Sequence, residues 1–301
     1  MSRAIQNLLR WYRKNKRDLP WRDVVDANGK PDAYKIFVSE IMLQQTQVDR
    51  VIPKFETWLH AFPSWKKLAE AKNADVIRAW SGLGYNRRAL YARDASRQVV
   101  LRGVPHTEDE WRALPGVGPY TAAAIAGFAN RKRTIAIDTN VRRVTGRVFC
   151  GIPFPQLKDT DHILRVLRTV LPKRGKYWEI PAAFMDLGSS VCRSAAPHCQ
   201  VCPLRVDCKA RQKFERGTQH VPLTKTSERI HRNKKYPDRI YRGRILSLVC
   251  KAPCVKRKIG ARIDDTYDDE NDAEWIERMI ARLVRDKLIE DKNEKLFLPR
   301  E

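Results

Sequence analysis

The sequence predicts an all-α fold. Apolar side chains recur at helical spacing along most of the first 191 residues, and patterns typical of strands are almost absent from that stretch. The chain has 301 residues, which is long enough for roughly two domains with a sizeable core.

The expected helices follow one another closely through this first part. Residues 1–23 carry Ile5, Leu8 and Leu9 at helical spacing and end at the turn RDLPWR. Residues 33–58 form one or two long helices, and Pro53 marks a join because proline interrupts a helix interior. Further helices are expected over Trp65–Ala71, Ala74–Trp80, Arg87–Leu101, Glu108–Leu114, Tyr120–Asn130, Thr139–Phe149, Asp159–Val170 and Tyr177–Val191.

The last third of the chain has a different composition. Lys209–Asp238 is polar and basic with few apolar anchors, which is typical of a linker. Helices are expected over Arg239–Val249 and Asp272–Lys287, and Leu288–Leu298 is typical of two short strands around a polar turn. Helix, helix and hairpin in this order predict a small winged-helix-like unit. The acidic run Asp264–Glu274 is expected to be a solvated loop that leads into a helix.

The charge balance indicates a nucleic-acid partner. The net charge of +24 is typical of proteins that bind DNA or RNA. No apolar run is long enough for a membrane span, and the first 22 residues lack an apolar signal core. We therefore expect an intracellular protein of the cytoplasm or nucleoid. No oligomerisation pattern is visible, so a monomer is expected.

Four of the seven cysteines lie within seventeen residues and are the most specific pattern in the chain. They are Cys192, Cys199, Cys202 and Cys208, with six, two and five residues between successive members. Four thiolates at such spacing can hold a structural zinc ion or a [4Fe–4S] cluster. The spacing alone leaves these two alternatives open. It does not suggest a disulfide framework of an oxidising compartment.

A glycine-punctuated turn precedes a short helical run and a carboxylate. Gly116, Val117 and Gly118 open a helix, and backbone N–H groups at a helix start suit a phosphate oxygen. Further on, Asp138 stands shortly before two arginines and is expected to be ionised. A backbone that grips anions beside a fixed negative charge indicates an enzyme that holds nucleic acid and stabilises a cation.

A second carboxylate lies in the predicted helix that contains VSEIMLQQTQV. Glu40 stands among apolar neighbours, and a carboxylic acid against an apolar wall can act as a general acid near neutrality. The uncharged run that follows could contact base edges. Trp21 and Tyr85 lie close to arginines, and Tyr120 follows the glycine turn. In a basic protein such aromatic residues are candidates for base stacking.

Taken together, these stretches resemble the helix-hairpin-helix DNA glycosylase superfamily, and within it the MutY-type adenine DNA glycosylases. The resemblance covers residues 1–215 in unbroken order: LPWR, VSEIMLQQTQV, GLGYNRRA, LPGVGPYTAAAI, IDTNVRRV, FMDLGSSVC and the four-cysteine loop. It implies a two-lobed helical fold with the active site in the cleft between the lobes. It also implies a [4Fe–4S] cluster, held by Cys192, Cys199, Cys202 and Cys208.

The resemblance assigns roles to the matching positions. Glu40 would protonate the flipped adenine, and Asp138 would stabilise the oxocarbenium-like sugar. The position of Tyr120 holds a lysine in bifunctional relatives, where it forms a Schiff base, so tyrosine implies a monofunctional enzyme. The implied DNA contacts are Gln45, Tyr85, Gly116, Val117 and Gly118, and the implied pocket residues are Arg17, Trp21, Leu43, Tyr120, Asn140 and Asp186.

The function expected from this resemblance is base excision repair: removal of adenine mispaired with 8-oxoguanine or guanine in double-stranded DNA. Two alternatives remain, a thymine or uracil glycosylase acting on G mismatches and a catalytically silent protein that binds damaged DNA. The expected organisation is a glycosylase domain over 1–215, a basic linker over 216–238 and a winged-helix-like unit over 239–301. That last unit does not resemble the Nudix-like domain of typical MutY proteins, so the preferred opposite base stays open.

Overall fold

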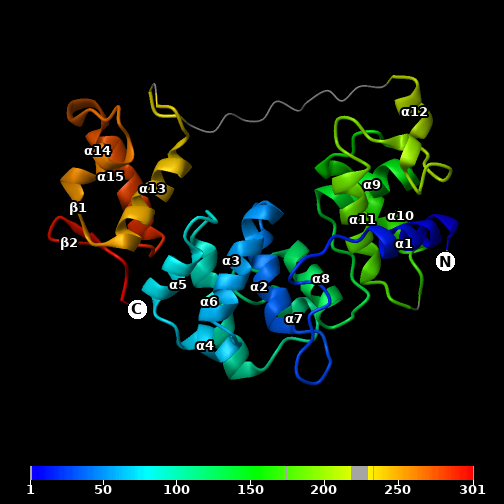
Figure 1. Ribbon diagram of the computed structural model, residues 1–301, viewed down its shortest axis with the longest axis horizontal. Coiled ribbons are helices and arrows are strands. Elements are labelled where there is room, and N and C mark those ends of the chain that lie inside the picture. The colour runs from blue at the N-terminus through cyan, green and yellow to red at the C-terminus, as the bar shows by residue number, and fades with distance from the viewer. Residues whose placement is uncertain (1, 174, 218–229, 233, 301) are drawn as a thin grey trace. The chain divides into compact units, whose positions relative to one another are not determined.

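The computed structural model describes residues 2–173, 175–217, 230–232 and 234–300 (Figure 1). The first helices are α1 (Arg3–Asn15), α2 (Ala33–Leu43), α3 (Val48–Ala61), α4 (Trp65–Glu70), α5 (Asn73–Trp80) and α6 (Arg87–Arg102). They are followed by α7 (Glu108–Arg112), α8 (Pro119–Phe128), α9 (Thr139–Cys150), α10 (Thr160–Val170), α11 (Glu179–Ser190) and α12 (Arg211–Glu215). The predicted all-α fold of this region is confirmed. No helix among the described residues is long and apolar enough to cross a membrane.

The chain folds into two compact units, each assembled from separate stretches of sequence. The first unit comprises residues 1–36, 105–113 and 117–223, and the second comprises residues 37–104, 114–116 and 224–301. One boundary therefore falls within α2, and another falls within the glycine turn before α8.

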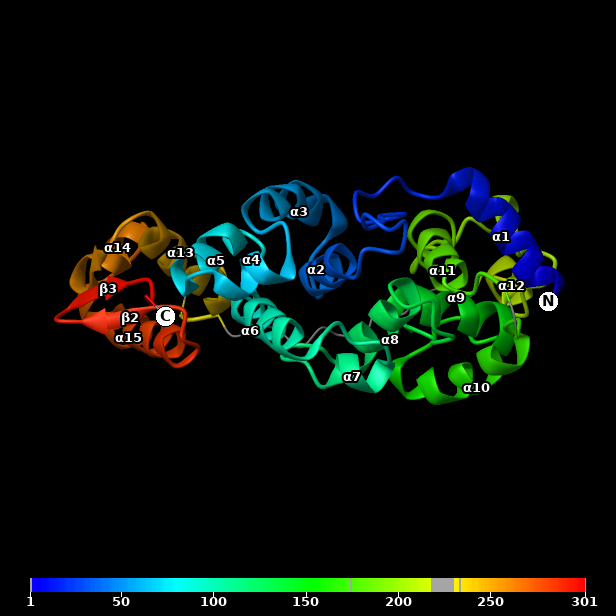
Figure 2. The ribbon, with the colours of Figure 1, turned by 90° about the horizontal axis from the view of Figure 1, so that it is seen from below.

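The core of the first unit lies between α1, α9, α10 and α11, which pack against one another in pairs (Figure 2). Helix α1 has an apolar stripe, and Ile5 and Leu8 on it are fully buried. They join Val144, Ile163 and Leu187 in one apolar cluster. This core positions the start of α9 and the loop that follows α11.

The second unit begins with the helices from α2 to α6. Helix α4 packs on α6, and α5 packs on both α3 and α6. Trp58 and Trp80 are fully buried and meet edge to face, with ring centroids 5.3 Å apart.

The same unit contains the C-terminal elements α13 (Asp238–Lys251), β1 (Cys254–Val255), α14 (Ile259–Ile263), α15 (Asp269–Arg285), β2 (Glu290–Lys292) and β3 (Lys295–Phe297). The strands form an antiparallel sheet in the order β1-β3-β2. Asn293 and Glu294 both have positive φ, as a two-residue hairpin turn requires. Ile77 of α5 and Leu90 of α6 belong to the apolar core of these elements. The C-terminal elements are thus packed onto α5 and α6.

The order of helix, helix and hairpin agrees with the sequence-based expectation, and α14 and β1 are additions to it. Each is too short to show a periodic pattern. The linker proposed over 216–238 lies largely outside the described residues. The boundaries at 1–215 and 239–301 stay predictions.

Two local expectations were wrong. Pro53 lies inside α3, which continues through it, and the apolar residues Val51, Phe55 and Trp58 on either side of it are buried and hold the helix in place. The helix break lies at Gln45 instead, whose φ of 53° cannot continue a right-handed helix. Asp264 and Asp272 in the acidic run are buried rather than solvated, because Lys234 pairs with both at 2.7 and 2.5 Å.

Candidate functional site

Asp138 is the N-cap of α9, so its carboxylate is held by the start of that helix. Its Oδ1 accepts a hydrogen bond from the Val141 N–H at 2.6 Å, and its Oδ2 accepts one from the Asn140 amide at 2.8 Å. The N-terminus of a helix stabilises negative charge. Backbone and side chain together therefore orient this carboxylate.

Asn140 links Asp138 to the cysteine loop. Asn140 Oδ1 accepts a hydrogen bond from Arg143 Nη2 at 2.7 Å, and Arg143 Nε donates to the Cys192 carbonyl at 2.8 Å. The same guanidinium donates to the Gly188 carbonyl at 2.7 Å. Among the described residues no ion pair joins Arg143 to Asp138. The side-chain amide of Asn140 lies between them and hydrogen-bonds to both.

The four cysteines of the loop line one cavity after α11, together with Arg147, Arg205 and Phe214. Arg147 is almost fully buried and donates to Cys192 Sγ at 3.3 Å and to the Arg193 carbonyl at 2.7 Å. Burial raises the pKa of the Cys202 thiol to about 12 and raises that of Cys208 as well. A metal that binds these sulfurs would displace their protons, because metal binding favours the thiolate.

Asp186 on α11 is held by two arginines from the turn after α1. Arg17 Nε donates to Oδ1 at 2.6 Å, and Arg22 donates to both carboxylate oxygens at 2.7 and 2.8 Å. Burial alone would raise the pKa of Asp186, but the hydrogen bonds from Arg22 and Arg17 lower it below its usual range. Sequence reasoning missed Arg22, although it is the last residue of LPWR. Trp21 beside it is buried.

The turn between α7 and α8 requires glycine. Gly116 has a φ of 75°, and a Cβ at this position would lie 2.8 Å from Tyr91 Cβ. Gln44 Nε2 donates to the Gly116 carbonyl at 3.1 Å. Gly118 is the N-cap of α8 and offers no side-chain cap. Tyr120 follows in the first turn of that helix and packs beside a small alanine cluster.

Five predicted site residues belong to the second unit, namely Gly116 of the glycine turn and four residues of α2 and the loops near it. Glu40 lies on α2 with an exposed fraction of 8%, in the same helix as fully buried Phe37. Leu43 ends that helix and is half-buried. Gln45 and Tyr85 are exposed loop residues with φ values of 53° and 46°. Glu40 thus has the sheltered environment expected of it, and Gln45 and Tyr85 are accessible to a partner.

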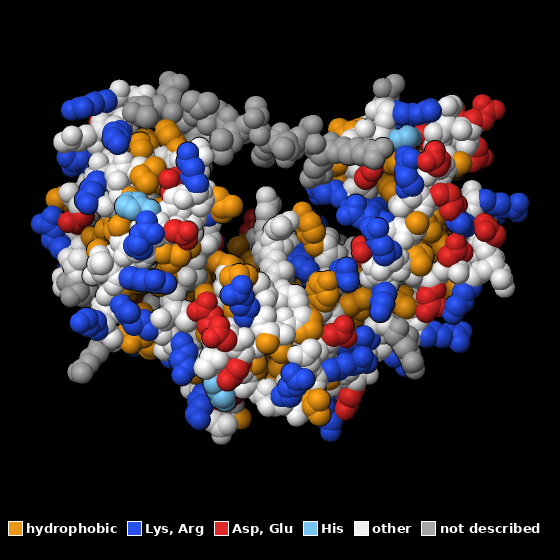
Figure 3. Space-filling model, turned by 180° about the vertical axis from the view of Figure 1, so that it is seen from behind, with side chains coloured by type: hydrophobic (Ala, Val, Ile, Leu, Met, Phe, Trp, Pro, Cys, Tyr) orange, Lys and Arg blue, Asp and Glu red, His pale blue; other side chains and the backbone are white. Residues whose placement is uncertain are grey.

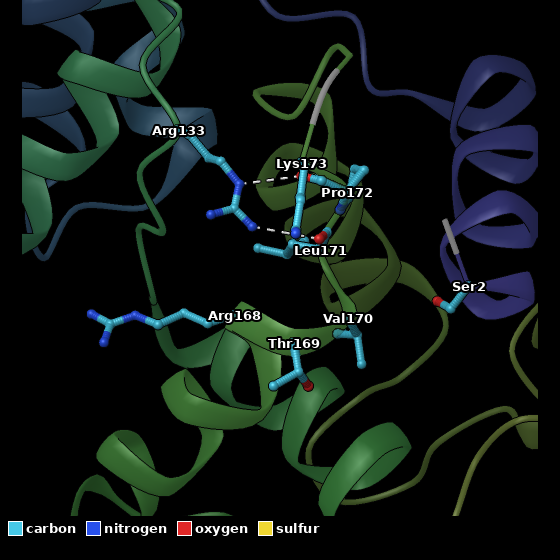
Figure 4. Close-up of a pocket in the computed structure, with 8 residues that line it drawn as sticks. All are labelled: Ser2, Arg133, Arg168, Thr169, Val170, Leu171, Pro172 and Lys173. Atoms are coloured by element: carbon cyan, nitrogen blue, oxygen red, sulfur yellow. Dashed lines mark hydrogen bonds between the residues drawn. The ribbon is translucent and has the colours of Figure 1, made fainter.

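A cavity of about 630 Å³ lies elsewhere in the first unit (Figure 4). Its lining includes Arg133, Arg168 and Lys173, and Arg133 donates to the carbonyls of Pro172 and Leu171 at 3.2 and 3.5 Å. None of its lining residues is a predicted site residue. Lys and Arg side chains are also scattered widely over the surface (Figure 3).

Comparisons with known proteins show the family of this chain. The HhH-GPD superfamily of base excision DNA repair proteins matches residues 38–169. The adenine DNA glycosylase of Mus musculus is 41% identical over 217 residues, which are 70% of this chain and 42% of that protein. This chain therefore spans less than half the length of the mouse relative.

Two further proteins match this chain over most of their own length. The adenine DNA glycosylase of Mycolicibacterium smegmatis is 37% identical over 255 residues, which are 83% of this chain and 81% of that protein. A thermostable thymine-DNA glycosylase has the same fold, with a TM-score of 0.62 at 24% identity over 69% of this chain and 95% of that one. From this coverage and identity, the chain belongs to the HhH-GPD superfamily of base excision DNA repair proteins, as a MutY-type member.

Proposed function

We propose that this protein is an adenine DNA glycosylase. It flips an adenine mispaired with 8-oxoguanine or guanine out of the duplex and hydrolyses its N-glycosidic bond. The observation that carries the proposal is the similarity, over most of the chain, to relatives named adenine DNA glycosylase. We further propose that it acts inside the cell, where its DNA substrate lies, and that it binds double-stranded DNA as a monomer.

The two carboxylates take different parts in the reaction. Glu40, sheltered on α2, donates a proton to the flipped adenine, which makes the base a better leaving group. Asp138, oriented by the start of α9, stabilises the positive charge that develops on the sugar. The N-glycosidic bond breaks and adenine leaves with the added proton. Water then adds to the sugar carbon, and the proton that this water loses returns to the Glu40 carboxylate. Tyr120 carries no amine, so no Schiff base forms and strand cleavage is not expected.

DNA contacts are assigned to exposed loops and to the glycine turn. Gln45 and Tyr85 would enter the base stack, and Gly116, Val117 and Gly118 would approach a phosphate through their backbone. Arg17, Trp21, Leu43, Asn140 and Asp186 would shape the adenine pocket. The contacts of Asp186 support a positioning role for it, because both of its oxygens accept hydrogen bonds from arginines.

A [4Fe–4S] cluster is assigned to Cys192, Cys199, Cys202 and Cys208. All four thiols line one cavity, yet no three candidate ligands among the described residues are gathered closely enough for a single metal ion. Arg205 lines the same cavity, and its buried Nε has no hydrogen-bond acceptor. The cavity supports a group held by all four thiols, and the choice of a cluster over a zinc ion follows from the resemblance to MutY-type glycosylases. When bound, the cluster would order the loop; no chemical step passes through it.

Metal analysis tests this assignment. The purified protein should contain iron and acid-labile sulfide in equal amounts, and Cys199→Ser should lower both. Cys250→Ser, which changes a cysteine outside the loop, is the matched control. Stoichiometric zinc without sulfide would contradict the cluster.

Single-turnover base release tests the enzymatic proposal. Four duplexes of one sequence would carry A opposite 8-oxoguanine, A opposite G, T opposite G and U opposite G. We expect adenine release, fastest from the first duplex, and none from Glu40→Gln, which should still bind the duplex. Release of T or U alone, or of no base at all, would overturn the proposal.

A further inference from the structure

Arg88, near the start of α6, is a buried arginine that connects two surface loops of the second unit. Its exposed fraction is 7%. One loop ends α2 and carries Gln45, and the other precedes α6 and carries Tyr85.

All five N–H groups of Arg88 are used, and they are shared between the two loops. Nη1 donates to the carbonyls at the end of α2, namely those of Ile41, Met42 and Gln44 at 2.8, 3.1 and 2.6 Å. Nη2 donates to Thr46 Oγ1 and to the Gly84 carbonyl, both at 3.0 Å. Nε donates to the Tyr85 carbonyl at 3.3 Å. The planar fork thus fixes both loops at once.

Each of the two loops contains an exposed residue with an unfavourable backbone. Gln45 and Tyr85 have φ values of 53° and 46°, which non-glycine residues adopt only when their surroundings hold them there. The acceptors of Arg88 include the carbonyl of Tyr85 itself and those of the neighbours Gln44 and Gly84. The hydrogen bonds therefore act at the strained positions.

The charge of Arg88 is balanced by dipoles rather than by an acid. Among the described residues no carboxylate pairs with it, and its guanidinium lies 5.1 Å from the Trp80 ring centroid and 5.6 Å from that of Tyr85. Burial lowers the pKa of Arg88 to about 10, so it keeps its charge at neutral pH. The carbonyls at the end of α2 form the negative end of that helix dipole, which suits a cation.

We infer that Arg88 is a positioning residue, which holds Gln45 and Tyr85 in the backbone conformation needed to enter a distorted base stack. This rests on the proposed function. Lysine has the charge but lacks the fork, so it cannot hold both loops. Loss of the fork should weaken binding to distorted DNA and leave phosphate-driven binding to an undamaged duplex unchanged.

Binding of two labelled duplexes to the full-length protein tests the inference. One duplex carries a tetrahydrofuran abasic analogue opposite 8-oxoguanine, and the other is undamaged. In Arg88→Lys the preference for the first duplex should fall by about tenfold or more, with affinity for the second unchanged. Arg93→Lys is the matched control, because Arg93 lies on the same helix, is 6% exposed and pairs, within the described part of the chain, only with Asp94.

A double-mutant cycle separates positioning from general destabilisation. If Arg88 acts through Tyr85, Arg88→Lys should cost far less in the background of Tyr85→Ser than in the wild type. Should Arg88→Lys fold poorly, Thr46→Val removes a single acceptor and should shift the preference in the same direction, to a smaller extent.

The outcomes are distinguishable. A wild type with no preference for the abasic duplex overturns the proposed function. If the wild type prefers the abasic duplex, two results would overturn the role of Arg88 and leave the proposed function intact. One is that Arg88→Lys and Thr46→Val keep the preference. The other is that the effects of Arg88→Lys and Tyr85→Ser are additive.

Discussion

At the scale of single residues, Asp138 combines two tasks. It is the N-cap of α9, where its Oδ1 accepts a hydrogen bond from the Val141 N–H. The same carboxylate is proposed to face the sugar. Sequence reasoning found the residue through its motif, but the hydrogen bonds of Asn140 and Arg143 became visible only in the folded chain. The chain of contacts from Asp138 to the Cys192 carbonyl ties the proposed catalytic carboxylate to the cysteine loop.

Asp138→Asn should separate these two tasks. Asparagine can still cap the helix through its Oδ1, but its Nδ2 cannot accept the hydrogen bond that Asn140 donates to Asp138 Oδ2, so the thermal stability should fall modestly. The single-turnover rate of adenine release should fall on the order of 10²–10³-fold, because the charge opposite the cationic sugar is lost. A near-normal rate in a folded variant would contradict the assigned role.

Asp186 predicts a pH effect on stability. Its pKa lies below the usual value of 3.8, so its charge stabilises the fold at neutral pH, and that contribution is lost as the pH falls through the lowered pKa. Asp186→Asn should cost about 3 kcal/mol in the free energy of unfolding at pH 7, and the difference from wild type should shrink in acid. Urea unfolding at several pH values measures this. Glu274→Gln, at an exposed ion pair, should have little effect at any pH.

At the scale of elements, the helices were predictable and the breaks between them were not. A helix such as α1 or α10 can be predicted from its own sequence, because its apolar residues recur at helical spacing. The end of α2 depends instead on Gln45 and on Arg88, which lies more than forty residues away. The burial of Asp264 and Asp272 likewise depends on Lys234, from another segment. Such partners cannot be read from a local pattern.

Because the C-terminal elements pack on α5 and α6, a change in α6 should also destabilise the C-terminal elements. Leu90→Ala removes a buried side chain from their common core and should cost about 2–5 kcal/mol. Limited proteolysis should then cut the C-terminal elements faster than in the wild type. Leu101→Ala, at an 80% exposed position of the same helix, is the control. Equal effects of the two changes would argue against the shared core.

At the scale of the whole molecule, the net charge of +24 should dominate the affinity for undamaged DNA. Binding to an undamaged duplex should follow counterion release, so affinity should fall roughly 10³-fold between about 50 and 200 mM salt. The preference for a duplex with an abasic analogue should vary much less, because contacts with the base stack release few ions. Titrations at a series of salt concentrations measure both. A salt-independent affinity would contradict a phosphate-driven encounter.

The sequence by itself determined the helical class, the basic character and the motifs that place this chain in its superfamily. These properties depend on residue type and short spacing, which a linear pattern preserves. The tertiary structure alone decided that residues 37–104 and 224–301 share one compact unit, that Arg22 and Arg17 hold Asp186, and that Arg88 joins two loops. The physical reason is that burial and hydrogen-bond geometry depend on residues far apart in the chain, which meet only after folding.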